Sequence, residues 1–285
     1  IVCLVLGASA GHGALTAPLS DFVVMTRQAA LFVASPSLVK AAIGENVTKE
    51  MLGGPQVHVV ESGVAHNLAD DDAEAILLAR RYLAYFPLNA WEPPPRNDGP
   101  ATAPRLLDPI LDLIDPDPRK PYKVRPVLEL LADAGSVLEV QPAFGSCVVT
   151  ALARRGGCSV AIVANDPSAM AGTIDADGAD KASHFLGVAG AFHLPVIFLA
   201  DNPGVMSGTA AEREGTLRHA ARMFVAQHRL QVPKLHVTLR KAFGFGSSVM
   251  AMNPFDAQTP SVAFPAVTLG AMPVASVAES AKLDA

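Results

Sequence analysis

The stretches 6–13 (LGASAGHG) and 239–246 (LRKAFGFG) share one pattern, and this pattern decides how the chain is interpreted. In each, an apolar run ends at a leucine, and a Gly-x-Gly turn begins five residues later, at Gly11 and at Gly244. A short stretch that is compatible with a helix follows each turn. Two such turns at one offset, one per half, indicate either a duplicated strand–turn–helix unit or a coincidence in a chain rich in alanine, glycine and proline.

Around these turns the sequence predicts an α/β protein. Short apolar runs at 160–164, 196–200 and 235–239 are typical of buried strands, and so is the apolar run 1–6 at the start. Longer stretches at 178–192 and 211–227 predict helices. Strands that alternate with helices favour an α/β architecture. Because the sequence opens inside a strand, we expect it to be a fragment that begins partway through its first domain.

A proline-rich stretch separates two parts of the chain. Nine of the 23 prolines fall between Pro93 and Pro121, and such a segment cannot continue a helix or a central strand. A helix precedes it, with an N-cap and first-turn acids in the aspartates 70–72. We therefore predict the C-terminal part of one domain at 1–90, a linker at 91–118 and a second domain at 119–285.

Composition excludes several classes of protein. The length of 285 residues predicts about two domains. Half of the residues are hydrophobic and only 17% are charged, which excludes a disordered chain. Its 22 basic and 27 acidic residues give a net charge of −5, which argues against nucleic-acid binding. No uninterrupted apolar stretch reaches the roughly 20 residues of a membrane span.

The cysteines and histidines predict no metal site. Three cysteines without a CxxC pair indicate a reducing compartment, and we expect a cytoplasmic protein. His58 and His66 flank Glu61, but their spacing does not suit a metal, and we interpret both histidines as structural.

The two glycine-rich turns could hold an oxygen atom that carries negative charge. Such a turn points backbone N–H groups outward, and glycine lets a ligand approach the backbone closely. Neither turn has the third glycine of a dinucleotide loop, and the chain has no GxxxxGK[ST] motif. An oxyanion hole is the other candidate, in which each N–H can contribute about 3–4 kcal/mol.

A competing motif overlaps the first turn. The stretch 7–11 (GASAG) satisfies G-x-S-x-G, which in a strand–turn–helix context predicts a nucleophile elbow with Ser9 as the nucleophile. Asp201 and either His219 or His236 follow in the order that a hydrolase triad requires. This hypothesis would make the protein a serine hydrolase.

Taken together, the motifs resemble the carboxyltransferase (β) subunit of biotin-dependent acyl-CoA carboxylases, of the propionyl-CoA and acetyl-CoA carboxylase type. The matching stretches follow one another in the family's order through nearly the whole chain. They are 7–14 (GASAGHGA), 47–54 (VTKEMLGG), 62–66 (SGVAH), 122–125 (YKVR), 171–175 (AGTID), 201–204 (DNPG), 208–212 (GTAAE) and 240–244 (RKAFG).

The resemblance implies two crotonase-like β/α spiral domains, the first of them truncated at its N-terminus. It also implies a homo-oligomer, usually a hexamer, whose active site pairs the first domain of one subunit with the second domain of its neighbour. The implied reaction moves a carboxyl group from carboxybiotin, on a separate carrier protein, to the α-carbon of a short-chain acyl-CoA. The partners would be a biotin carboxylase and biotin carboxyl carrier subunit, and no metal is needed.

The resemblance also assigns site residues. The N–H groups of Gly11 and His12 would form an oxyanion hole for the acyl thioester, and those of Gly244 and Phe245 a hole for the biotin ureido oxygen. Biotin would take up the substrate's α-proton, so no protein base is required. The residues expected at the substrates are Ala10, Gly13, Gly204 and Ser248.

Two further alternatives stay open at this point. A biotin-dependent acyl-CoA decarboxylase would run the same half-reaction backwards. A chain that only assembles with partners would keep the fold and catalyse nothing.

Overall fold

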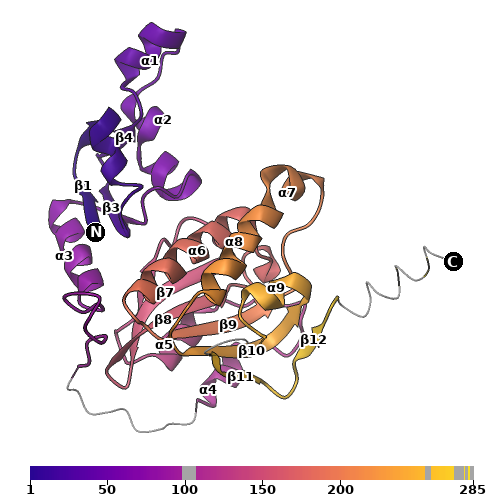
Figure 1. The fold of residues 1–285 in the computed structure, drawn as a ribbon. Coiled ribbons are helices and arrows are strands. Elements are labelled where there is room, and N and C mark those ends of the chain that lie inside the picture. Colours follow the sequence, from indigo (N-terminus) through magenta and orange to yellow (C-terminus); the bar gives the residue numbers. More distant parts are fainter. Residues whose placement is uncertain (98–106, 254–257, 273–278, 280–281, 283–285) are drawn as a thin grey trace. The chain divides into compact units, whose positions relative to one another are not determined.

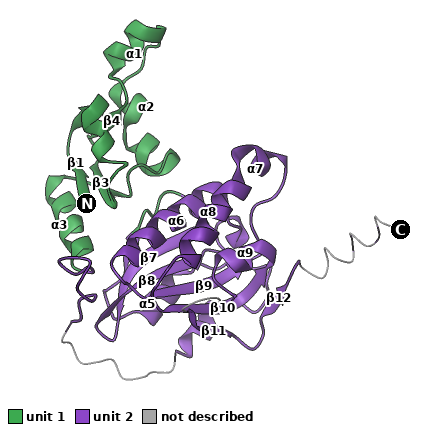
Figure 2. Ribbon diagram, viewed as in Figure 1, with its two compact units in different colours: residues 1–84, 140–144 green, residues 85–139, 145–285 purple. Residues whose placement is uncertain are grey.

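The computed structural model describes residues 1–97, 107–253, 258–272, 279 and 282 (Figure 1). It divides into two compact units, which are coloured separately in Figure 2. Unit 1 contains residues 1–84 and 140–144, and unit 2 contains residues 85–139 and 145–285. The linker and domain limits at 90 and 118 stay a prediction, and residues 98–106 of that linker lie outside the described residues.

Parallel strands form the centre of unit 1. One sheet has the order β1-β3-β5, and a separate pair joins β2 to β4. The bounds are β1 (Val2–Val5), β2 (Ala8–Ala10), β3 (Phe22–Thr26), β4 (Ala30–Phe32) and β5 (Asn67–Ala69). Apolar side chains from these strands, among them Val5, Val23, Met25 and Leu31, form a buried cluster. The strand that the first six residues predict is therefore confirmed as β1.

Short helices connect the strands of unit 1. They are η1 (Gly11–Thr16), α1 (Pro36–Ile43), α2 (Lys49–Gly53), η2 (Gln56–Glu61) and α3 (Asp72–Leu83). The aspartates before α3 cap it as predicted, because the Asp71 carboxylate accepts a hydrogen bond from the Glu74 N–H at 2.9 Å. Tyr82 of α3 stacks on Phe22 of β3 with ring centroids 4.1 Å apart, which anchors the helix to the sheet.

A larger sheet organises unit 2. It has seven strands in the described residues, with the order β11-β10-β9-β8-β7-β6 and β12 paired to β10. Strands β8 to β11 run parallel, and β7 pairs with β8 antiparallel. The bounds are β6 (Leu138–Val140), β7 (Val148–Arg155), β8 (Cys158–Asn165), β9 (Val196–Asn202), β10 (Lys234–Phe243), β11 (Gln258–Ala263) and β12 (Thr268–Gly270). The predicted strands at 160–164, 196–200 and 235–239 are confirmed as β8, β9 and β10.

Helices lie on both faces of this sheet. The helices of unit 2 are α4 (Pro109–Leu113), α5 (Arg125–Leu131), η3 (Met170–Gly172), α6 (Ala176–Ala191), α7 (Thr209–Glu214), α8 (Thr216–His228) and α9 (Gly244–Val249). Helices α6 and α8 pack side by side over one face (Figure 1). On the other face, apolar side chains of α4 and α5, such as Ile110 and Leu128, share a buried cluster with Val149, Ile162 and Leu199 of the strands.

Two details differ from the sequence-based expectation. The helix predicted at 211–227 is two helices, because Gly215 adopts φ 81° and ends α7 before α8 begins. The proline-rich stretch does contain a helix, since α4 begins at Pro109, and a proline in the first turn loses no intrahelical hydrogen bond. The α/β class itself is confirmed. In the described part of the chain, no helix combines the length and the apolar content that crossing a bilayer requires.

Candidate functional site

The first glycine turn lies in unit 1, where strand β2 ends. Ala10 is extended (φ −132°, ψ 152°), Gly11 adopts the left-handed φ of 61°, and η1 follows directly. Glycine is favoured at such a φ because it has no Cβ to clash with the backbone. The first N–H groups of η1 have no carbonyl partner within the helix, so this turn presents backbone donors. Gly11 and His12 are at the start of this helix, and the side chain of His12 is exposed.

A cavity of about 310 Å³ opens beside this turn. Gly11 and His12 line it, and its remaining lining is mainly apolar, with Leu15, Leu31 and Phe32 among the residues. His58 also lines the cavity, but both of its ring nitrogens are engaged: Nε2–H donates to the Leu31 carbonyl at 2.9 Å, and Nδ1 is 3.0 Å from Ser62 Oγ. The backbone donors therefore lie at the edge of an apolar chamber.

The second glycine turn lies in unit 2, where strand β10 ends. Phe243 is extended (φ −122°, ψ 145°), Gly244 adopts φ 53°, and α9 follows directly. A Cβ on Gly244 would lie 2.9 Å from the Ala271 carbonyl oxygen, so both conformation and space require glycine there. The turn has the same extended, left-handed, helical sequence of conformations as the first turn. The backbone similarity supports the interpretation of a duplicated unit over coincidence.

Gly204 packs against this second turn. A Cβ on Gly246 would lie 2.7 Å from Gly204 Cα and 2.3 Å from Asn202 Oδ1. The loop that follows β9 therefore touches the turn that follows β10, as expected where the carboxyl ends of neighbouring parallel strands meet. The structure thus brings Gly204 to the turn that contains Gly244 and Phe245, through contacts with Phe243 and Gly246. The role of these residues in binding stays a prediction.

The other predicted substrate residues are spread over both units. Ser248 is half-buried on α9, where its Oγ accepts a hydrogen bond from Asn253 Nδ2 at 3.2 Å. Phe245 is 38% exposed and lies against Phe224 of α8 with centroids 6.4 Å apart. Ala10 and Gly13 flank the first turn, and a Cβ on Gly13 would lie 3.2 Å from Ser9 Oγ. Unit 1 therefore holds Ala10 and Gly13, and unit 2 holds Ser248.

The nucleophile elbow at Ser9 is wrong. Ser9 lies inside strand β2, where it pairs with Leu31, whereas an elbow places the serine on a sharp turn between a strand and a helix. The proposed triad partners are also engaged elsewhere. Asp201 binds Arg240, His219 Nδ1 lies 2.7 Å from Asp180 Oδ1, and His236 bonds to Met250 O and Thr238 Oγ1. No Asp–His pair forms among these candidates in the described residues.

The histidines near Glu61 each make hydrogen bonds inside unit 1, which is compatible with the predicted structural role. His58 donates a hydrogen bond to the Leu31 carbonyl of strand β4. His66 accepts a hydrogen bond from the Val23 N–H at 2.8 Å and stacks near Phe22. Across the described ranges, no group of three or more metal-binding side chains comes together.

A buried group of charged residues in unit 2 was not predicted from the sequence. Arg240 and Lys241 of β10 are 5% and 8% exposed, and Asp201 at the end of β9 is fully buried. Burial raises the pKa of the Asp201 carboxyl, and the neighbouring Arg240 charge opposes that rise. A signal for this group was present, because two consecutive cations, Arg240 and Lys241, follow the predicted strand at 235–239 and precede the apolar pair Ala242 and Phe243.

Comparison with known proteins places the chain in one family. The pattern of the family described as "Carboxyl transferase domain" matches residues 1–280. The methylmalonyl-CoA carboxyltransferase 12S subunit of Propionibacterium freudenreichii subsp. shermanii is 39% identical over 256 residues, which are 88% of this chain and 47% of that protein. The propionyl-CoA carboxylase carboxyltransferase subunit of Haloferax mediterranei is 34% identical, over 95% of this chain and 52% of that protein.

A third relative is named for a different reaction. The methylmalonyl-CoA decarboxylase subunit alpha of Veillonella parvula is 35% identical over 88% of this chain and 49% of its own length. The chain therefore spans about half the length of these curated relatives.

Solved structures give the same result for the fold. A transcarboxylase 12S crystal structure, described with a hexamer assembly and hydrolysed methylmalonyl-coenzyme A bound, superposes with a TM-score of 0.93 at 34% identity. The match covers 98% of this chain and 55% of that one.

Proposed function

The chain belongs to the carboxyl transferase domain family and has its crotonase-like α/β fold, and from this premise we propose that it transfers a carboxyl group from carboxybiotin to the α-carbon of a short-chain acyl-CoA. The observation that carries the proposal is the pair of matching backbone turns at Gly11 and Gly244. Carboxyl transfer to an enolised thioester develops charge on two carbonyl oxygens, and two sets of N–H donors suit two such oxygens.

The first turn would act on the acyl thioester. The N–H groups of Gly11 and His12 donate to its carbonyl oxygen, which favours loss of the α-proton by stabilising the negative charge that develops there. The adjoining apolar cavity, with Leu15, Leu31 and Phe32 in its lining, fits an apolar acyl group. Ala10 and Gly13 leave the approach to the turn free of large side chains.

The second turn would act on biotin. A turn that offers backbone N–H donors suits the uncharged ureido oxygen of biotin. The turn itself is closely packed, because a Cβ on Gly244 or Gly246 would lie within 3 Å of backbone atoms of Ala271 or Gly204. The N–H groups of Gly244 and Phe245 would donate to the ureido oxygen, with Ser248 on the same helix, α9. When bound, carboxybiotin on its carrier protein supplies the carboxyl group.

Partners and location extend the same proposal. A biotin carboxylase and a biotin carboxyl carrier subunit would supply the donor, and a homo-oligomer, such as the hexamer of the 12S relative, would bring the first turn of one copy to the second turn of another. We place the protein in the cytoplasm, since Cys3, Cys147 and Cys158 are free in the structure and a reducing compartment keeps thiols in that state.

The experiment that tests the function is an assay of the full-length protein with carboxybiotin on its carrier and a panel of acyl-CoAs. Carboxylated acyl-CoA, detected by mass spectrometry and dependent on carboxybiotin, is the expected product. Absence of product with every acyl-CoA, in a protein that binds acyl-CoA and is folded, would contradict the proposal.

The decarboxylase is the second candidate, and the Veillonella relative favours it. The same turns would then stabilise the enolate that forms as the acyl-CoA loses its carboxyl group to biotin. A full-length protein that carboxylates free biotin from a carboxylated acyl-CoA, and does not run the forward transfer with its own partner subunits, would establish this direction.

A further inference from the structure

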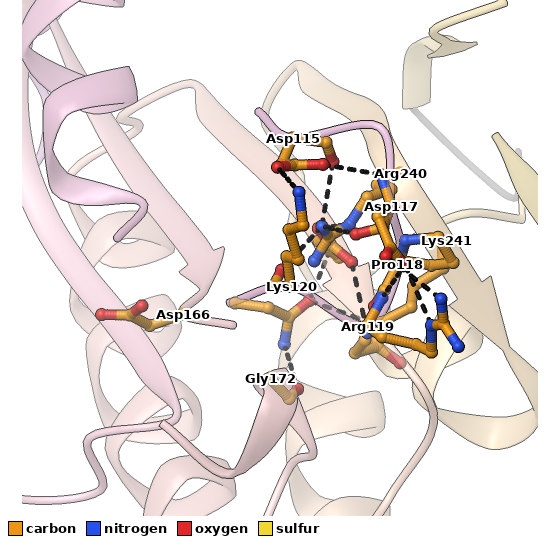
Figure 3. Close-up of polar contacts among 12 residues, drawn as sticks. Asp115, Asp117, Pro118, Arg119, Lys120, Asp166, Gly172, Arg240 and Lys241 are labelled. Atoms are coloured by element: carbon orange, nitrogen blue, oxygen red, sulfur yellow. Dashed lines mark hydrogen bonds and ion pairs between the residues drawn. The ribbon is translucent and has the colours of Figure 1, made fainter. Parts of the chain in front are cut away.

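Arg240 of β10 forms hydrogen bonds with two other segments of unit 2, the end of β9 and the loop at 115–120. Its Nε donates to Asp201 Oδ2 at 3.0 Å, and its Nη1 lies within hydrogen-bond distance of three carbonyl oxygens: Asp115 at 3.0 Å, Asp117 at 2.8 Å and Lys120 at 2.9 Å. Figure 3 shows the guanidinium of Arg240 directed into this loop. The group also lies over the Tyr122 ring, 5.0 Å from its centroid.

The residues that Arg240 holds form a tight loop before α5. Asp115 accepts from the Asp117 N–H and from Lys120 Nζ, and Asp117 accepts from the Arg119 N–H, so these carboxylates are satisfied within the loop. The carbonyl oxygens are left to face β10. Lys241 adds a second link, because its Nζ donates to the Pro118 carbonyl at 3.2 Å (Figure 3).

The sheet is irregular where Arg240 lies. Strands β9 and β10 pair in register up to Thr238 and Ala200, and pairing resumes at Ala242 and Asn202. Three residues of β10 therefore stand opposite the single residue Asp201, which is a bulge. Because backbone pairing is interrupted there, the buried pair of Arg240 and Asp201 joins the two strands across the bulge.

Both ends of this pair lead directly to the second turn. Asp201 is three residues before Gly204, and Arg240 is four residues before Gly244. Gly204 in turn lies against Gly246, so the spacing of the two strand ends sets the shape of the turn. A buried arginine with a planar fork can fix such a spacing, since it bonds in two directions at once.

We propose that Arg240 is a positioning residue for the second backbone turn: by binding Asp201 and the loop Asp115–Lys120 together, it holds Gly204 and Gly244 in the arrangement that receives biotin. This inference rests on the proposed function. It assigns to Arg240 no contact with a substrate. It predicts that loss of the contact between Arg240 and the loop Asp115–Lys120 slows carboxyl transfer from biotin and leaves acyl-CoA binding unchanged.

The test compares Arg240→Gln and Arg240→Lys in the full-length enzyme with its carrier partner. Displacing a catalytic group by about 1 Å can cost on the order of a hundredfold in rate, and this loss in kcat is expected for Arg240→Gln, with the acyl-CoA dissociation constant within about twofold of wild type. Arg240→Lys restores the charge but cannot reach both Asp201 and the loop, so it should recover part of the rate.

Two further variants make the assignment specific. Arg119→Ala is the matched control, because Arg119 lies in the same loop with its side chain 88% exposed, and kcat should stay within about twofold of wild type. Asp201→Asn should lower kcat less than Arg240→Gln does, because it weakens only the contact between the two strands. The double variant should be no slower than Arg240→Gln alone, since Arg240→Gln already removes the contact that Asp201→Asn weakens.

Several results would overturn the inference. One is a kcat for Arg240→Gln within threefold of wild type. Another is parallel loss of acyl-CoA binding and transfer in both Arg240 variants, which would make Arg240 a support of the whole fold. A wild-type enzyme that transfers no carboxyl group to any acyl-CoA would instead overturn the proposed function, and the role of Arg240 with it.

Discussion

The two glycine turns share a left-handed glycine between an extended residue and a helix, and they have different surroundings. The first follows the short strand β2 and opens on an apolar cavity, whereas the second follows the ten-residue strand β10 and rests on buried charges. Among the described residues of unit 1, no lysine, arginine or carboxylate is buried, while unit 2 buries Lys181, Asp201 and Arg240. The difference shows that one backbone conformation can occur in two environments. Apolar packing surrounds the first turn, and buried ion pairs lie next to the second.

The largest expected effect comes from removing one N–H donor from each turn. Proline is tolerated in the first turn of a helix, so Phe245→Pro and His12→Pro remove a donor with little strain on the helix itself. Each should lower kcat for carboxyl transfer by about 10²–10³. Steady-state kinetics with the full-length enzyme measures the loss.

Alanine at the same positions is the control for that prediction. Phe245→Ala and His12→Ala keep the N–H and should keep kcat within about tenfold of wild type. If the proline variant of one turn is inactive and that of the other is fully active, only one turn stabilises charge and the comparison between them fails.

A smaller effect is expected on stability, and it should distinguish the two turns. Gly246→Ala places a Cβ 2.7 Å from Gly204 Cα, which is backbone, and should destabilise the protein by about 1–3 kcal/mol. Gly13→Ala places one 3.2 Å from Ser9 Oγ, which can rotate away, and should cost less. Thermal unfolding of both variants gives the comparison. Equal losses, or a larger one for Gly13→Ala, would contradict it.

The buried charges of unit 2 predict a dependence of stability on pH. Burial lowers the pKa of Lys181 from 10.5 to about 8. The unfolded chain therefore binds this proton more tightly than the folded one, and stability should rise as pH increases from 8 toward 10.5. Burial also raises the pKa of the Cys147 thiol from 9.0 to about 12, which lowers stability above pH 9.

The window from pH 8 to 9 therefore reports chiefly on Lys181, with a smaller contribution from Lys241, whose pKa burial also lowers. Lys181→Met should reduce the rise of the unfolding temperature across this window, as measured by calorimetry. A wild-type protein whose unfolding temperature falls between pH 8 and 9 would show that Lys181 keeps an ordinary pKa. Among the described residues of unit 1 no lysine is buried, so no lysine of that unit contributes to the change of unfolding temperature with pH.

The smallest effect is expected at Ser9. Ser9→Ala should leave carboxyl transfer within about twofold of wild type, because Ser9 lies in strand β2 and donates nothing to the proposed reaction. Transfer assays measure this rate, and a fluorophosphonate probe should leave Ser9 unlabelled. Complete loss of activity, or labelling of Ser9, would restore the hydrolase hypothesis.

Local sequence pattern was sufficient for much of the fold. Strands β8 and β9 contain apolar runs buried on both faces, and β10 contains the apolar residues Leu235, Val237 and Leu239 in alternation. Asp71 caps α3 through a contact that spans only three residues. The pattern failed where two local signals compete. At Gly215 a left-handed glycine ends helix α7, although the helical pattern of apolar residues continues beyond it. At Pro109 a helix begins, although the surrounding stretch is rich in proline.

The candidate site divides in the same way. The sequence by itself determined the two turns, because a glycine after a strand and before a helix is a local signal for a left-handed residue with free N–H groups. Only the tertiary structure decided that Gly204 packs on Gly246, and that Arg240 links Asp201 to the loop Asp115–Lys120. These contacts join residues that are 39 to 125 positions apart, and no local pattern encodes which distant groups a buried charge will meet.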